Sequence, residues 1–122
     1  MMQIDIQARR FSLTESLREH IKRRLGFALS IHNEHIQRVL VRLSDINGPR
    51  GGDDKQCHIQ VMLPQLPDVV IEDIEADMYA AIDRAADRAG RTVGRRLTRQ
   101  RDKRHSPLPQ GGNLIDLTGD LS

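Results

Sequence analysis

The sequence is poor in cysteine and in long apolar runs, and each shortage excludes a class of protein. A single cysteine in 122 residues excludes an internal disulfide framework and a cysteine-rich zinc site. No stretch approaches the roughly 20 apolar residues that a membrane-spanning helix needs. Residues 1–5 also lack the apolar core of a signal peptide. We therefore expect a cytoplasmic protein without a membrane partner, and the length favours a single domain.

Aromatic residues make up only 2% of the chain, and tryptophan is absent. Proteins that recognise single-stranded RNA by sequence stack its bases on aromatic side chains of an exposed surface. The three aromatics here, Phe11, Phe27 and Tyr79, lie outside the strands predicted below. A nucleic-acid partner should therefore be recognised through phosphates, 2′-hydroxyls and the shape of a folded RNA.

Charge is segregated along the chain, although the formal net charge is only +2. Residues 31–83 hold ten acidic and four basic side chains, whereas residues 84–104 hold nine basic and two acidic ones. Eight of these nine bases are arginine, which forms bidentate contacts with phosphate. This concentration indicates a polyanionic partner.

Hydrophobic periodicity predicts four strands and two helices. Alternation of apolar and polar residues predicts strands over 3–8, 39–44 and 56–63. A β-branched run at 69–71 predicts a fourth strand, after a turn forced by Pro64 and Pro67. Apolar residues at helical spacing predict helices from Thr14 to Leu29 and from about Glu75 to Leu97.

The order β-α-β-β-β-α, with one polar face on each strand, predicts an α+β fold. Two amphipathic helices should pack on one face of a four-stranded sheet to give a two-layer sandwich. Gly90 and Gly94 each disfavour the second helix by about 1 kcal/mol relative to alanine, so packing or a partner should hold its distal half. We expect residues 1–104 to form this domain, and residues 105–122, rich in Pro and Gly at their start, to form a disordered tail.

Five arginines form one face of the second predicted helix. At 100° per residue they fall within an arc of about 80°. Asp87 with Arg91 is the only i,i+4 pair of opposite charge in this segment, so the face should repel itself unless it meets an anion. A face that only improves solubility is the alternative. The predicted phosphate-binding residues are Arg84, Arg88, Arg91, Arg95 and Arg99. If both helices pack on one side of the sheet, Arg18 and Lys22 of the first helix could extend this site.

Signatures of catalysis and of metal binding are weak. His32, Glu34 and His35 have a spacing that suits a metal, but no further His or Cys lies nearby in the sequence, and a solvated loop is favoured. Cys57 should point into the core, where a buried thiol is inert. Asp77, in the acidic run before the second helix, is best explained as a helix cap. We therefore expect no enzyme, no cofactor, no metal and no small-molecule substrate.

The stretch Asp77–Asp83, which follows an acidic strand end and opens an arginine-rich helix, resembles the ribosome hibernation-promoting factor family, also called ribosome-associated inhibitors. The order of elements and the Leu13-Thr14 start of the first helix agree, and the resemblance covers roughly residues 2–104. It implies a fold similar to the double-stranded-RNA-binding domain. It also implies binding to the small ribosomal subunit in the channel of messenger and transfer RNA, which blocks translation and preserves idle ribosomes under stress.

The basic residues that match the family's pattern imply an RNA-binding site formed by Arg84, Arg88, Arg91 and Arg95, with Arg18 and Lys22. A long, glycine-rich loop at residues 47–55 and the two helix glycines depart from the family pattern and suggest a divergent branch. Only 18 residues follow Arg104, so the dimerisation domain of the family's long form is not expected, and the protein should be monomeric off the ribosome. Two alternatives stay open: a general module for structured RNA, and a protein-interaction adaptor that uses the Leu114–Leu117 part of the tail.

Overall fold

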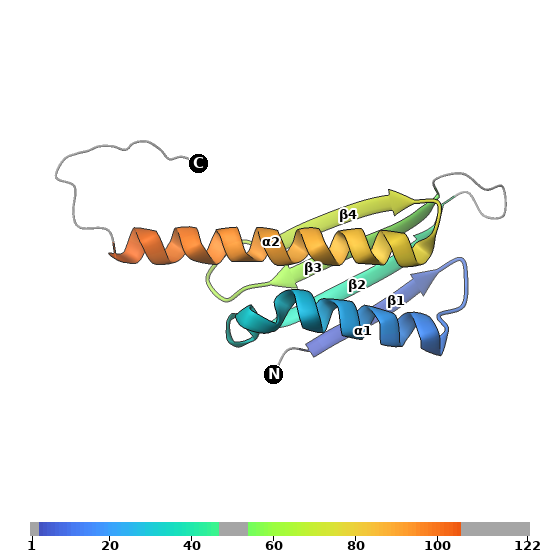
Figure 1. Cartoon of the computed structure of the whole chain (residues 1–122), viewed down its shortest axis with the longest axis horizontal. Helices are drawn as coiled ribbons and strands as arrows, with labels where there is room; N and C mark the ends of the chain where they lie inside the picture. Colours follow the sequence, from blue (N-terminus) through green and yellow to red (C-terminus); the bar gives the residue numbers. More distant parts are fainter. Residues whose placement is uncertain (1–2, 47–53, 106–122) are drawn as a thin grey trace.

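The computed structural model describes residues 3–46 and 54–105, which form a four-stranded sheet covered on one face by two helices. The elements along the chain are β1 (Gln3–Arg9), α1 (Glu15–Leu29), the 3-10 helix η1 (Ser30–His35), β2 (Arg38–Asp45), β3 (Lys55–Met62), β4 (Val69–Glu75) and α2 (Met78–His105). This order confirms the predicted α+β class (Figure 1). Most of the predicted loop at 47–55 and nearly all of the tail lie outside the described residues.

The sheet has the strand order β1-β2-β3-β4, and its only parallel pair is β1 with β2 among the described strands. The connection between these two strands is α1, because a parallel pair needs a crossover rather than a hairpin. The other neighbours are antiparallel. Between β3 and β4 the chain turns at Gln65, whose φ is 66°, between the two prolines that the sequence analysis identified.

The helices begin where side-chain oxygens can satisfy free backbone amides. Thr14 caps α1 by accepting a hydrogen bond from the amide of Leu17 at 3.1 Å. Asp77 caps α2 by accepting one from the amide of Ala80 at 3.1 Å, as predicted. Thr14 therefore precedes α1 instead of opening it, and α2 begins at Met78, because β4 continues to Glu75. The 3-10 turn η1 was not predicted, because it has no buried residue to give it a periodic signal.

The core lies between the helices and the sheet. Its fully buried members include Ile21 and Leu25 of α1, Val41 of β2 and Ile59 of β3. From α2 the core receives mainly alanines, together with Ile82 and Val93. Small residues let α2 lie close to β3 and β4, so this helix is held firmly along its first four turns. No helix in residues 3–46 and 54–105 is long and apolar enough to span a membrane.

The two helix glycines do not interrupt α2. Gly90 faces α1, where an added Cβ would lie only 2.7 Å from the carbonyl oxygen of Ala28. Gly94 faces His32 of η1, whose Nε2 would lie 3.2 Å from such a Cβ. The glycines are therefore places where the helices approach closely, and packing compensates for their low helix propensity, as expected for the distal half of α2.

Candidate nucleic-acid interface

The predicted arginines lie on one continuous face of α2. Because α2 is unbroken from Met78 to His105, the helical spacing of the sequence becomes a real row of side chains. All five residues are exposed: Arg84, Arg88, Arg91, Arg95 and Arg99. Figure 1 shows that α2 extends beyond the end of the sheet, so the distal part of the row is accessible from several directions.

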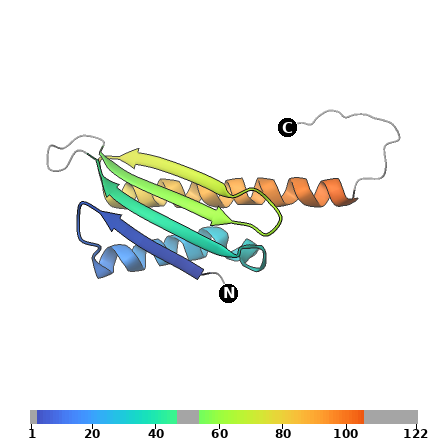
Figure 2. The same cartoon turned by 180° about the vertical axis from the view of Figure 1, so that it is seen from behind.

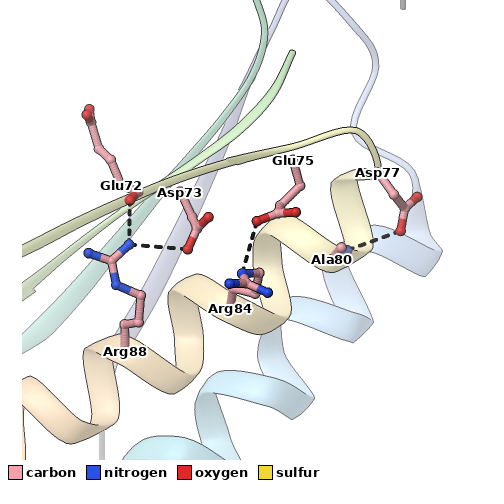
Figure 3. A network of polar contacts seen from close by, with 7 residues as sticks. All are labelled: Glu72, Asp73, Glu75, Asp77, Ala80, Arg84 and Arg88. Atoms are coloured by element: carbon pink, nitrogen blue, oxygen red, sulfur yellow. Dashed lines mark hydrogen bonds and ion pairs between the residues drawn. The ribbon is translucent and has the colours of Figure 1, made fainter. Parts of the chain in front are cut away.

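The first two arginines of the row are bound by strand β4. The Nε of Arg84 lies 3.0 Å from an oxygen of Glu75. The guanidinium of Arg88 donates to the backbone carbonyl of Glu72 at 2.8 Å and to the carboxylate of Asp73 at 3.2 Å (Figure 3). Asp73 is largely buried, with a side-chain exposure of 12%, so the Arg88–Asp73 pair is more shielded from solvent than the other ion pairs of the arginine row. The acidic end of β4 therefore neutralises the proximal part of the arginine row.

The distal arginines have weaker partners. Arg91 forms an i,i+4 ion pair with Asp87 at 3.1 Å, and both side chains are about 60% exposed. Arg95 donates to the hydroxyl of Thr92 at 3.3 Å. Arg99 has no hydrogen bond or ion pair with the residues that the structure describes. Exposed pairs of this kind contribute little to stability, so these three guanidinium groups can exchange their partners for phosphate at small cost.

A further arginine of α2, Arg96, has a structural contact that the sequence analysis missed. Its guanidinium donates to the backbone carbonyls of Pro67 at 2.8 Å and Asp68 at 3.2 Å. It thereby ties the distal half of α2 to the turn before β4. No local pattern marks this residue, because its partners are main-chain atoms nearly 30 positions away.

Basic residues of the two helices do not converge on one patch. In α2, Gly90 faces α1, and the five arginines lie about 100° to 180° around the helix from Gly90. In α1, His20 faces α2, because its Nε2 lies 2.6 Å from a carboxylate oxygen of Asp83. Arg18 and Lys22 lie about 160° around α1 from His20. They are therefore directed away from α2, so packing the two helices on one face of the sheet does not bring Arg18 and Lys22 beside the arginine row, and their part in binding stays a prediction.

The seam between the helices is a polar cluster around Asp83. Besides His20, the guanidinium of Arg24 lies 3.2 Å from the same Asp83 oxygen, and the ring of Tyr79 packs edge-on against His20 with centroids 4.9 Å apart. Tyr79 and Asp83 both belong to the stretch that carries the family resemblance. Their contacts here hold α1 against α2, which indicates that this stretch positions the arginine row.

The other residues considered for chemistry have structural environments. Burial raises the pKa of the Cys57 thiol to about 12, with a smaller contribution from the negative charge of Asp73, so this buried cysteine is confirmed as part of the core. His32 packs on Gly94. Its pKa is lowered mainly by burial and, to a smaller extent, by the positive charge of the neighbouring His35. Among the described residues, no three His, Cys, Asp or Glu side chains are grouped to hold a metal ion.

Comparison with known proteins adds three findings. The family model described as Sigma 54 modulation protein / S30EA ribosomal protein matches residues 4–101. The crystal structure of the N-terminal domain of Thermus thermophilus Protein Y is 30% identical with a TM-score of 0.63, over 78% of this chain and 98% of that chain. A ribosomal subunit interface protein from Coxiella burnetii shares the fold, with 17% identity and a TM-score of 0.68, over 80% of this chain and 99% of that one. No curated protein matches.

Proposed function

Because this chain belongs to the Sigma 54 modulation protein / S30EA ribosomal protein family, we propose that it binds the small ribosomal subunit and blocks the channel of messenger and transfer RNA. The family membership bears out the resemblance to ribosome hibernation factors on which the sequence analysis relied. It makes the protein a ribosome-associated factor of the hibernation family. The choice of subunit, the blocked channel and the cytoplasmic location are parts of the proposal.

The observation that carries the proposal is the arginine row of α2 on a rigid support. Its distal members, Arg91, Arg95 and Arg99, are exposed and only weakly paired, while β4 and the turn before it fix the helix through Arg88 and Arg96. A row of exposed guanidinium groups on a firmly held helix can bind several phosphates of a folded RNA. The protein would act by occupying space, since the proposal gives no residue a catalytic role.

Co-sedimentation with ribosomal subunits tests the proposal. Purified protein is mixed with separated subunits and with vacant ribosomes at low and moderate salt, and a generic RNA duplex serves as competitor. We expect retention on the small subunit despite the competitor, and a log–log salt slope of about 0.7 to 0.9 for each phosphate contact. Loss of the protein to the competitor would favour the alternative of a general module for structured RNA.

Matched variants connect the binding to the arginine row. The double variant Arg95→Glu/Arg99→Glu should lose the subunit while keeping its circular dichroism and melting temperature. The control Glu15→Arg/Glu19→Arg changes the charge on α1 by the same amount in the opposite direction, and should retain binding. Truncation after His105 tests the adaptor alternative, which requires the tail. Binding by the Glu double variant at the wild-type level would refute the role of the row.

A further inference from the structure

No helix or strand of the described residues covers the face of the sheet opposite the helices, which Figure 2 shows from behind. Its side chains alternate with those of the core. The strand register places Gln7, Arg42, His58 and Glu72 side by side in one row across β1, β2, β3 and β4. The middle of this polar row borders a hollow lined by Asp5, Gln7, Leu40, Val41, Arg42, His58 and Gln60.

Three of the side chains around the hollow are held in place by partners at its margin. Arg38 donates to Asp5 at 2.6 Å. The amide of Gln60 donates to Asp68 at 2.6 Å. These bonds hold the polar side chains around the apolar floor of the hollow, which Leu40 and Val41 contribute, without neutralising the centre of the face.

The third held side chain is His58, whose Nδ1 lies 3.0 Å from an oxygen of Glu72. Glu72 is the acidic residue of the row, and it is occupied by this contact on the β4 side. The Nε2 atom of His58 is left for another partner. In a neutral histidine whose Nδ1–H donates to a carboxylate, Nε2 is a hydrogen-bond acceptor; in a protonated one, it is a donor.

Arg42, at the centre of the face, differs from the paired arginines. It is exposed and has no hydrogen bond or ion pair with the residues described, whereas Arg38 on the same strand is bound to Asp5. Arg9 follows Gln7 by two positions on β1 and is also exposed, which places it diagonally from Arg42 in the register. The β1–β2 half of the face therefore presents two uncompensated guanidinium groups.

We infer that this hollow is a second RNA contact, in which Arg42 binds a backbone phosphate and the neighbouring groups bind the adjoining ribose. The donors, Arg42 and the Gln7 amide, suit phosphate oxygens. The acceptor Asp5 and the unoccupied Nε2 of His58 suit a 2′-hydroxyl, which both donates and accepts hydrogen bonds and which RNA has and DNA lacks. The inference rests on the proposed function, and it means that a protein filling an RNA-lined channel contacts RNA with its sheet as well as its helices.

Neutralising Arg42 tests the contact. We compare Arg42→Gln with Arg10→Gln, a matched control that removes the same charge from an exposed arginine beyond the end of β1 and outside the hollow. Arg42→Gln should keep the wild-type melting temperature, bind the small subunit about tenfold more weakly, and reduce the log–log salt slope by about 0.7 to 0.9. Arg10→Gln should bind with nearly the wild-type affinity.

A directed cleavage experiment locates the face on the ribosome. An iron chelate that generates hydroxyl radicals is attached to cysteine in Val70→Cys, which is exposed on the same sheet face but outside the hollow, or in Thr98→Cys, on α2. The native Cys57 is fully buried and does not compete for the reagent. We expect ribosomal RNA cleavage from both positions, at different nucleotides.

The outcomes separate this inference from the proposed function. If wild-type protein binds the subunit but Arg42→Gln behaves like Arg10→Gln and Val70→Cys gives no cleavage, the sheet contact is refuted while the function stands. If wild-type protein does not bind ribosomes, the proposed function fails and this inference fails with it. If His58→Phe binds the small subunit as tightly as the wild type while Arg42→Gln binds more weakly, the ribose part of the inference is refuted and the phosphate contact stands.

Discussion

Replacement of Gly90 by alanine tests how closely the two helices approach. In a helix interior, glycine to alanine normally stabilises by about 1 kcal/mol, because alanine loses less backbone entropy on folding. At Gly90 the new Cβ would lie 2.7 Å from the carbonyl oxygen of Ala28, a distance that real Cβ contacts essentially never show. A main-chain carbonyl inside a helix cannot rotate away, so α1 and α2 must separate along their seam.

The size of the effect follows from comparing Gly90→Ala with Gly26→Ala. An added Cβ at Gly26, inside α1, meets nothing within 4 Å, so this control receives the gain in helix propensity without a clash. Overpacking costs about 1 to 3 kcal/mol. The propensity gain is common to both variants, so Gly90→Ala should be less stable than Gly26→Ala by about 1 to 3 kcal/mol. For a domain of this size each 1 kcal/mol corresponds to about 4–8 °C in melting temperature.

Thermal and urea unfolding of the two variants and the wild type measure this difference. We expect Gly26→Ala to unfold above the wild type and Gly90→Ala below it or close to it. Gly94→Ala should lie between them, because its Cβ meets the ring of His32 at 3.2 Å and a side chain can move. Equal stabilisation by Gly26→Ala and Gly90→Ala would refute the close approach of Gly90 to the Ala28 carbonyl. Gly90 would then affect α2 only through its low helix propensity.

Three further predictions concern individual side chains. Arg88→Ala should lower the free energy of unfolding by about 0.5–1.5 kcal/mol, because its hydrogen bond to the Glu72 carbonyl is lost. Arg99→Ala should change it by less than about 0.5 kcal/mol. Equal losses in urea unfolding would contradict the difference between the β4-bound and the unbound arginines of the row. Because the pKa of His32 is lowered in the folded state, the unfolded chain binds the proton more readily, so His32 should reduce stability as the pH falls through about 6.5. The difference in free energy of unfolding between wild type and His32→Gln, measured over a pH series, gives this contribution. A difference that does not change with pH would count against it. Cys57, with a thiol pKa of about 12 and no exposure, should react with a thiol reagent only on unfolding, and rapid labelling of the native protein would show that β3 is more open than described.

The division of the arginine row illustrates what spacing cannot reveal. Helical periodicity placed the five arginines on one face, and the unbroken α2 bears this out. It could not distinguish Arg88, which β4 binds, from Arg99, which no described residue binds. The distinction depends on which strand packs beside the helix. The sheet hollow was missed for the same reason, because Gln7, Arg42 and His58 meet only through strand register.

Sequence by itself determined the class of fold, because alternation along four short segments and helical spacing along two longer ones depend on neighbours within a few positions. It also determined the Asp77 cap of α2 and the family, which rest on contiguous residues. Tertiary structure decided the direction in which each basic residue points. Arg18 and Lys22 are separated from the α2 row because Gly90 and His20 fix the rotation of each helix about its own axis. That rotation is set by long-range packing, and no pattern within a single helix encodes it.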